Sequence, residues 1–431
     1  MAMASVALRF VRPANRRLVG RLASVPAFFG LRVASALLLL KLSAHFLSVE
    51  AFAIFTQFML FAALLNLASV AGMQNGLIRQ SAAATDAEAL GQVRRAAFLI
   101  WASAIPVLLL PIIALSGTIS HVLAGTDERW PAVILIAMLA VAAGPGQIWC
   151  GLLSGRKHVP SSLAAQAVGL VLGTGMAAWL IVRGDPVAAV IGFVACSLVT
   201  MGLAWLFASR LEVTRAPSHR APGEVSVLLR YSAAFAGSAG LTSIALFGLR
   251  FLYRESFGGV PLGYWMAANR ISDMSTQLLG LFMIQFFVPH LTMIESEAAR
   301  RRFALRCWMI AAAIMAAVLF VFTAAAQPLV HLFLSDSYVP AIPFIRAYMV
   351  GDLLRVAVSL AMFSALAAGR PGRYALIDMG TVALMTAIMA VLISLGDLRA
   401  PQFAYVGAYA ISAMLVGAGL LLRRNARLAS A

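Results

Sequence analysis

Long apolar stretches recur along this chain, and they constrain its fold more than any other feature. An α-helix rises about 1.5 Å per residue, so about 20 apolar residues are enough to cross the hydrocarbon core of a bilayer. With 62% hydrophobic and 11% charged residues, the chain has too little polar surface for a soluble globule. The sequence therefore predicts an all-α polytopic membrane protein with about twelve transmembrane helices. The predicted spans cover residues 22–42, 52–72, 96–118, 131–153, 163–182, 187–208, 227–250, 263–289, 304–325, 342–368, 374–395 and 400–422.

The basic residues alternate between the loops on the two sides of the predicted membrane region. A formal net charge of +17 would suit nucleic acid if it formed one patch, but most basic residues fall at the two termini and in every second loop. Basic loops mark the cytoplasmic side, so both termini are expected in the cytoplasm. The basic charge then reports topology and contact with lipid headgroups, and we expect no nucleic-acid partner. The basic residues assigned to the opposite side are Arg129, Arg183, Arg250, Arg254 and Arg399.

A polar, proline-bearing stretch near the middle of the chain, Ser209 to Ser226, separates six predicted spans from six. This stretch predicts an N-terminal six-helix bundle over residues 1–215 and a C-terminal six-helix bundle over residues 216–431. Aligning Phe46 with Phe257 places FLSVEAFAIF on FGGVPLGYWM, which is a weak match at the second span of each half. We expect two parallel repeats related by a pseudo-twofold axis along the membrane normal.

Charged side chains lie deep in two of the predicted spans. Arg270 and Asp273 are at positions i and i+3, so they share one helix face and can pair, and Gln277 extends this polar face. Asp352 and Arg355 repeat the arrangement in the tenth span. An ionised side chain at this depth costs about 2.5–3.5 kcal/mol on insertion scales. Such pairs either lock two helices together or line a path for a solute, and their repetition favours the path.

The first span contributes two further basic side chains, Arg32 and Lys41. They lie on opposite sides of a straight helix and cannot both face one cavity. We favour Arg32 as the cavity residue because it is deeper, and Lys41 can pair with a neighbouring helix, but both are candidate substrate-binding residues. A net positive lining selects an anionic solute, and the arginine fork suits phosphate oxygens.

Signatures of catalysis are missing from the sequence. There is no G-x-x-x-x-G-K-[ST] loop for ATP and no cluster typical of a metal site or a nucleophilic triad. Cys150, Cys196 and Cys307 all fall within predicted spans, so no disulfide framework is expected. We therefore expect no cofactor, no metal and no enzyme activity. The sequence Gly144-Pro145-Gly146 interrupts the fourth span and is read either as a static kink or as a hinge.

Several of these motifs resemble those of known flippases. Gly263-Tyr264-Trp265 followed by Arg270-Ile271-Ser272-Asp273 is similar to the eighth helix of the Wzx O-antigen translocases, and its spacing to Pro289 resembles the same helix in lipid II flippases. Gln57-Phe58 and Gly72-Met73-Gln74-Asn75-Gly76 resemble the F-x-Q-F…G-x-x-N-G stretch of the Wzx group. Both groups belong to the multidrug/oligosaccharidyl-lipid/polysaccharide (MOP) exporter superfamily. Lipid II flippases usually carry two extra C-terminal helices, whereas twelve spans are predicted here, so we expect a substrate other than a peptidoglycan precursor.

The resemblance implies translocation of an undecaprenyl-diphosphate-linked oligosaccharide from the cytoplasmic to the periplasmic leaflet of a bacterial inner membrane. It implies a monomer in contact with membrane lipid, with a polysaccharide polymerase and a chain-length regulator as candidate partners. Two alternatives are a multidrug or cation antiporter of the same superfamily and a membrane polysaccharide polymerase. Arg32 and Lys41, with no acid in the first two spans, disfavour the antiporter. The short loops disfavour the polymerase.

Overall fold

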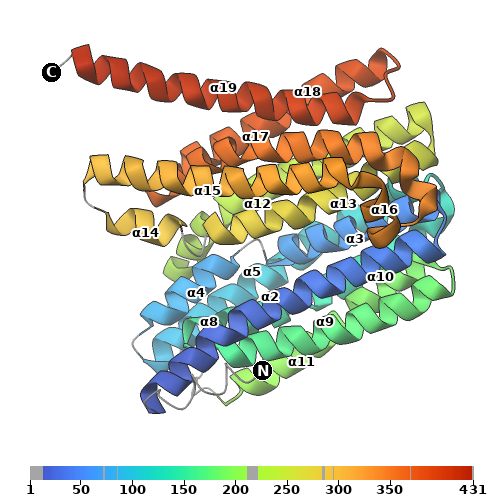
Figure 1. Ribbon diagram of the computed structural model, residues 1–431. Helices are drawn as coiled ribbons and strands as arrows, with labels where there is room; N and C mark the ends of the chain where they lie inside the picture. Colours follow the sequence, from blue (N-terminus) through green and yellow to red (C-terminus); the bar gives the residue numbers. More distant parts are fainter. Residues whose placement is uncertain are drawn as a thin grey trace. The chain divides into compact units, whose positions relative to one another are not determined.

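The computed structural model of the chain is helical in the residues that it describes, which are 13–70, 73–84, 86–210, 222–283, 287–294, 296–368 and 370–429 (Figure 1). Residues 211–221 of the predicted linker, Gly72 of the resemblance motif and residues 284–286 of the predicted eighth span lie outside this part. No strand occurs within the described ranges.

Each of the twelve predicted spans has a helical counterpart, which confirms the predicted all-α polytopic membrane fold. Nine stretches among the described residues are long and apolar enough to cross a membrane. Helices α12, α13 and α19 coincide with the other three predicted spans. The counterparts are α2 (Pro13–Phe46), α3 (Val49–Ser69), α5 (Ala87–Ala114), α7 (Trp130–Ala142) with α8 (Gly144–Gly155), α9 (Val159–Val182), α10 (Pro186–Ala195) with α11 (Ser197–Ala208), α12 (Pro222–Phe257), α13 (Gly259–Phe282) with α14 (Val288–Met293), α15 (Glu297–Ala324), α17 (Ile342–Ala367), α18 (Pro371–Ser394) and α19 (Ala400–Ala429).

Local sequence signals set where several of these helices begin. Asp86 precedes α5 and accepts a hydrogen bond from the backbone N–H of Ala89 at 2.7 Å. Asp185 caps α10 in the same way, with a 2.9 Å bond from the N–H of Ala188. Pro186 then occupies the first turn of α10, where its fixed φ suits a helix and its missing N–H costs no bond. Caps of this kind fix the residue at which a helix begins after a short connection between spans.

The chain forms two compact units, and the first comprises residues 1–39, 58–121 and 126–236. In this unit α9 packs against α10 and α11, while α8 packs against α4 (Gln74–Ala83), α5 and α11. A core of buried apolar side chains that includes Met73, Leu90 and Ile148 joins these helices. The interrupted fourth span is seen here, because α7 ends at Ala142 and α8 begins at Gly144.

The second unit comprises residues 40–57, 122–125 and 237–431. Helix α17 is central to it and packs against α13, α15, α18 and α19. Its core includes Leu279, Phe287, Met315 and Val356. The end of α2 and the beginning of α3 belong to this unit, so the compact units do not follow one cut in the sequence. The predicted division at residues 215 and 216 stays a prediction.

The order of elements repeats along the chain. Val49, Ala87 and Ser116 begin α3, α5 and the short helix α6 (Ser116–Ala124). Gly259, Glu297 and Ala326 begin α13, α15 and the short helix α16 (Ala326–Phe333), each at the same interval from its counterpart. A short 3-10 helix follows in both places, η2 (Asp127–Arg129) and η4 (Asp336–Ala341). The repeat is therefore clearer in the order and spacing of the helices than in the identity of the residues.

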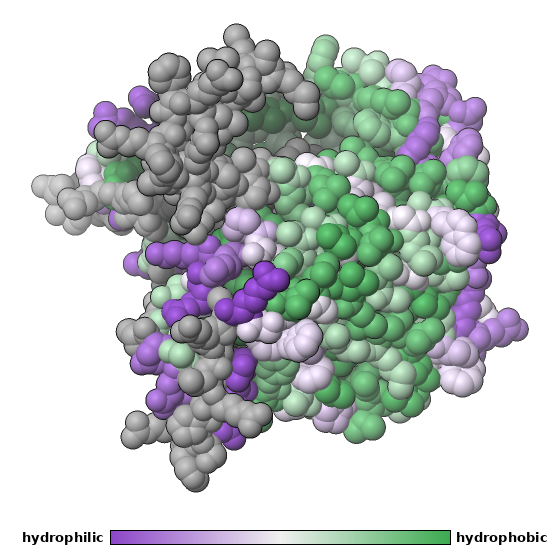
Figure 2. Space-filling view, turned by 90° about the horizontal axis from the view of Figure 1, so that it is seen from below, coloured by the Kyte–Doolittle hydropathy of each residue, from purple (hydrophilic) through white to green (hydrophobic). Residues whose placement is uncertain are grey.

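Large hydrophobic side chains are exposed on the outer faces of the helices, as a bilayer requires. Examples are Val107 on α5, Phe320 on α15 and Leu415 on α19, which are 70%, 71% and 67% exposed. Figure 2 shows one face on which hydrophobic residues cover the middle and hydrophilic residues gather toward both ends. Such a face suits the hydrocarbon core and the two headgroup layers.

Candidate functional site

Charged side chains meet inside the second unit around Asp273 of α13. Asp273 interacts electrostatically with Arg270 of the same helix, Arg355 of α17 and Arg250 of α12. Its Oδ2 atom accepts a hydrogen bond from Nδ2 of Asn269 at 3.1 Å. We refer to Arg250, Arg270, Arg355 and Asp273 as the arginine cluster. Three guanidinium groups facing one carboxylate leave an excess of positive charge.

The predicted contact between Arg270 and Asp273 is not a direct ion pair. No salt bridge within 4 Å joins them, and no hydrogen bond links Arg270 to another described residue. The side chain of Arg270 is half-buried. Among the described residues nothing accepts a hydrogen bond from its guanidinium, which can therefore donate to a ligand while it remains within electrostatic range of Asp273.

Arg250 belongs to this cluster, although from the sequence it counts only as a basic residue of the non-cytoplasmic side, at the end of the span 227–250. Helix α12 continues to Phe257, so Arg250 lies within the helix and is only 3% exposed. Its Cζ atom lies 5.8 Å from the ring centroid of Trp265 and 5.9 Å from that of Phe247. The predicted span ended at residue 250 because Arg250 and Arg254 lower the average hydropathy there, although the helix continues to Phe257.

Asp352 and Arg355 are joined through a third residue. The fully buried Asp352 accepts hydrogen bonds at its Oδ1 atom from Ser272 Oγ at 2.8 Å and from the Tyr405 hydroxyl at 2.7 Å. Nη1 of Arg355 donates to the same Tyr405 oxygen at 3.3 Å. No direct salt bridge between Asp352 and Arg355 occurs in the described part of the chain. The i,i+3 spacing thus brings both charges to one face, and Tyr405 bridges them.

Packing against a glycine fixes the position of Tyr405. A side chain at Gly351 would collide with the Tyr405 ring, so only glycine lets α19 approach α17 this closely. The Tyr405 ring stacks on that of Tyr348, with centroids 4.2 Å apart and planes at 12°. Nε1 of Trp265 donates a 2.5 Å hydrogen bond to the Tyr348 hydroxyl. Each member of the bridge from Arg355 to Asp352 is therefore positioned by its neighbour.

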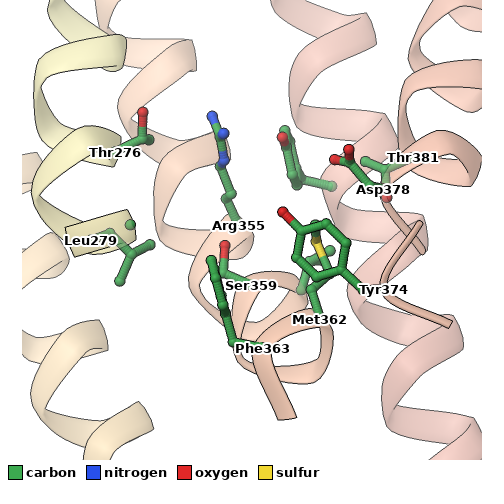
Figure 3. A pocket seen from close by; sticks show the side chains of 12 residues that line it. Thr276, Leu279, Arg355, Ser359, Met362, Phe363, Tyr374, Asp378 and Thr381 are labelled. Atoms are coloured by element: carbon green, nitrogen blue, oxygen red, sulfur yellow. The ribbon is translucent and has the colours of Figure 1, made fainter. Parts of the chain in front are cut away.

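A cavity of about 140 Å³ lies beside this network, within the second unit. We call it the C-terminal cavity. Figure 3 shows Arg355, Tyr374 and Asp378 lining it, together with Thr276 and Ser359. Arg355 lies over the ring of Tyr409, with Cζ 5.6 Å from the centroid. Helices α13, α17, α18 and α19 supply the residues that surround this space, which are Thr276, Leu279, Gly280, Arg355, Val358, Ser359, Met362, Phe363, Tyr374, Asp378, Thr381 and Tyr409.

Lys41 binds the end of a short helix. Its Nζ atom donates to the carbonyl oxygens of His331 at 2.7 Å and Leu334 at 3.0 Å. These carbonyls lie at the C-terminus of α16, where the last turn has no intrahelical donors and the dipole favours a cation. Ser335 Oγ donates to the carbonyl of Ala44 at 2.8 Å and strengthens the same junction. The neighbouring element expected for Lys41 is therefore α16.

The remaining candidate residues, Arg32 and Gln277, are not among the residues that line the C-terminal cavity. Arg32 is exposed on α2, in the part of that helix that belongs to the first unit. Gln277 is exposed on α13, while Thr276 beside it lines the cavity. A role for either residue in substrate binding stays a prediction. Of the seven candidates, the structure brings Arg270, Asp273, Asp352 and Arg355 together in one charged network with Arg250.

Sequence reasoning missed the aromatic residues of the site. Tyr405 and Tyr409 are spaced i,i+4 on α19, so their side chains share one face of this helix. That spacing and the acid Asp378 on α18 are the signals that could have identified them. No group of three or more histidine, cysteine, aspartate or glutamate side chains in the described ranges could hold a metal ion.

Comparisons with known proteins agree with this architecture. The model of a family described as polysaccharide biosynthesis protein matches residues 42–343. An inward-facing multidrug resistance MATE family transporter of the MOP superfamily is 18% identical, with a TM-score of 0.73 over 92% of this chain and 94% of that one. The lipid II flippase MurJ in an inward closed conformation is 10% identical, with a TM-score of 0.72 over 93% and 87%. A search among curated proteins gives no match.

A third similar structure is a MOP superfamily transporter from Pyrococcus furiosus, which is 16% identical, with a TM-score of 0.61 and coverage of 95% of both chains. At these identities the solved structures establish the fold. The family model matches well over half of the chain. This multi-pass membrane protein therefore belongs to the polysaccharide biosynthesis protein family and has the fold of the MOP-superfamily transporters.

Proposed function

We propose that the protein transports an undecaprenyl-diphosphate-linked oligosaccharide from the cytoplasmic to the periplasmic leaflet of a bacterial inner membrane. The arginine cluster is the observation that carries this proposal. It places positive charge inside a helix bundle, where an isolated charge is costly and is kept for a function. A diphosphate is the anionic part of such a substrate, and arginine matches phosphate oxygens with paired donors.

Asp273 and Asp352 hold the arginines when no substrate is bound. Asp273 lies within electrostatic range of all three guanidinium groups, and Asp352 reaches Arg355 through Tyr405. A buried arginine without a partner would be strongly destabilising. The diphosphate then binds the donors of Arg270 and takes over from Asp273 as the nearby negative charge. Alternating access moves the bound substrate, driven by an ion gradient or by the gradient of the substrate itself.

This proposal assigns transport without an enzymatic step. Both termini lie in the cytoplasm, and the protein acts as a monomer that delivers its substrate to a polysaccharide polymerase and a chain-length regulator. A multidrug or cation antiporter would need an excess of acidic groups for its cargo. The arginine cluster has the opposite balance, which disfavours that alternative.

Substitutions at Arg270 test the proposal. If the diphosphate needs a positive charge here, Arg270→Lys retains part of the transport and Arg270→Ala loses most of it, with normal membrane insertion in both. Arg306→Ala is a matched control, because Arg306 is an exposed arginine on α15 of the same unit. The measurement is the surface glycan level divided by the amount of protein in the membrane.

A purely structural role for Arg270 leads to a different result. In that case Arg270→Ala lowers protein abundance because Asp273 loses a positive neighbour, and the double variant Arg270→Ala, Asp273→Ala restores both abundance and transport. A double variant that transports like the wild type would overturn the role of Arg270 in substrate binding.

A further inference from the structure

The charges in the lining of the C-terminal cavity differ from those of the arginine cluster. Arg355 and Asp378 are the two charged side chains among its lining residues, and they have opposite signs. An anion placed there is repelled by Asp378, and a cation is repelled by Arg355. A hydrocarbon chain makes no hydrogen bond with either group. The lining therefore suits a ligand that is neutral and polar.

The size of the cavity limits the ligand further. Its volume of about 140 Å³ has room for about ten water molecules, since one water needs roughly 10–15 Å³ of such space. A single sugar ring is of this order of size.

The chemistry of the lining matches the two kinds of surface on a sugar ring. Tyr374, Tyr409 and Phe363 supply aromatic faces for its C–H groups. Asp378 accepts hydrogen bonds from hydroxyl groups, and Arg355 donates to them. Figure 3 shows the polar ends of Arg355, Tyr374 and Asp378 pointing into the same space. Apolar walls with a few convergent polar groups are the usual composition of a small-molecule site.

The C-terminal cavity adjoins the arginine cluster through two elements. Arg355 is a member of both, since it interacts with Asp273 and also lines the cavity. On α13, Thr276 lines the cavity one turn after Asp273. A ligand with a sugar joined directly to a diphosphate can therefore place the sugar in the C-terminal cavity and the diphosphate at the arginine cluster. We propose that the C-terminal cavity binds the first sugar of the lipid-linked substrate.

This inference rests on the proposed function, and a binding experiment separates the two. The full-length protein in lipid nanodiscs is mixed with undecaprenyl diphosphate, or with the same lipid carrying one N-acetylglucosamine or one galactose. Native mass spectrometry measures the bound fraction of each. We expect the wild type to bind at least one sugar-bearing lipid about tenfold more tightly than undecaprenyl diphosphate, a difference of about 1.4 kcal/mol.

Two independent variants remove this preference. Asp378→Asn weakens the hydrogen bonds to the sugar hydroxyls. Gly280→Leu fills the cavity, because a side chain added at Gly280 meets no atom within 4 Å. Gly380→Leu is the matched control, since Gly380 on α18 is equally free of neighbours and is exposed outside the lining. Both cavity variants should bind all three lipids alike, while Gly380→Leu should keep the preference.

The outcomes distinguish the inference from the proposed function. A wild type that binds the three lipids equally, or cavity variants that keep the preference, would show that the cavity is not a sugar site. Loss of affinity for undecaprenyl diphosphate itself in Arg270→Ala is the separate test of the diphosphate site. If that variant binds undecaprenyl diphosphate like the wild type, the proposed function fails instead.

Discussion

Replacing Tyr405 with phenylalanine tests the bridge between Asp352 and Arg355. The change removes one oxygen atom and keeps the ring, so the stacking on Tyr348 at 4.2 Å is preserved. It removes the 2.7 Å bond to Asp352 and the 3.3 Å bond from Arg355. The Ser272 Oγ atom, at 2.8 Å, still donates to Asp352. The variant therefore isolates the contribution of the hydroxyl.

The expected loss follows from these two bonds. A hydrogen bond to a charged group contributes about 1.5–3 kcal/mol, and the longer bond from Arg355 contributes less because hydrogen bonds weaken with distance. We expect Tyr405→Phe to reduce stability by about 2–3 kcal/mol. For a unit of about this size a change of 1 kcal/mol shifts the unfolding midpoint by roughly 2–4 °C, so the midpoint should fall by about 4–12 °C.

The assay is a thermal unfolding scan of purified protein in detergent, with all variants heated at one rate because membrane proteins often unfold irreversibly. Tyr409→Phe is the control. Its hydroxyl makes no hydrogen bond with a described residue, although its ring contacts Tyr405 with centroids 4.9 Å apart. Its midpoint should change by less than about 2 °C. Equal midpoints for Tyr405→Phe and the wild type, or equal losses in both variants, would refute the bridging role.

Three further predictions concern other parts of the chain. Lys41→Met keeps the aliphatic part of the side chain and loses both hydrogen bonds to the end of α16. The variant should lose about 1–2 kcal/mol of stability and keep its transport per folded molecule. Lost transport at unchanged stability would instead indicate that Lys41 contacts the substrate. Gly263→Ala should destabilise by about 1–3 kcal/mol in the same scan, because a Cβ atom there collides with the Val49 backbone, whereas Gly280→Ala should be neutral. A cysteine at Ser218 should resist an impermeant maleimide in intact cells, and efficient labelling would contradict a cytoplasmic linker.

The helices were predictable from the sequence because each one satisfies a local requirement. A span needs length and low polarity, and both can be read in a window of the chain. The ends of the spans were less predictable where charged residues lie within a helix. Helix α12 carries Arg250 and Arg254 in its last turns, and the hydropathy pattern ended the predicted span at residue 250, before Arg254. Burial of Arg250 depends on Trp265 and Phe247, which a window of sequence does not reveal.

The site was predictable only in part, for a related reason. The i,i+3 spacing of Asp352 and Arg355 correctly placed both on one face of α17. It could not reveal that Tyr405 of α19 lies between them, since that contact depends on the close approach at Gly351. Lys41 illustrates the same limit. Its charge indicated a nearby acceptor, and only the tertiary structure identifies the acceptor as backbone carbonyls.

The repeated order of helices has a consequence for mutational tolerance. Helices α3 and α13 are counterparts that begin at Val49 and Gly259. The positions in α3 that match Arg270 and Asp273 are occupied by Leu60 and Ala63. A systematic substitution scan should therefore give two unlike profiles for two equivalent helices. Helix α3 should accept exchanges among apolar residues at these positions, whereas α13 should accept almost none, so that one copy of the repeat remains free to diverge while the other is held constant.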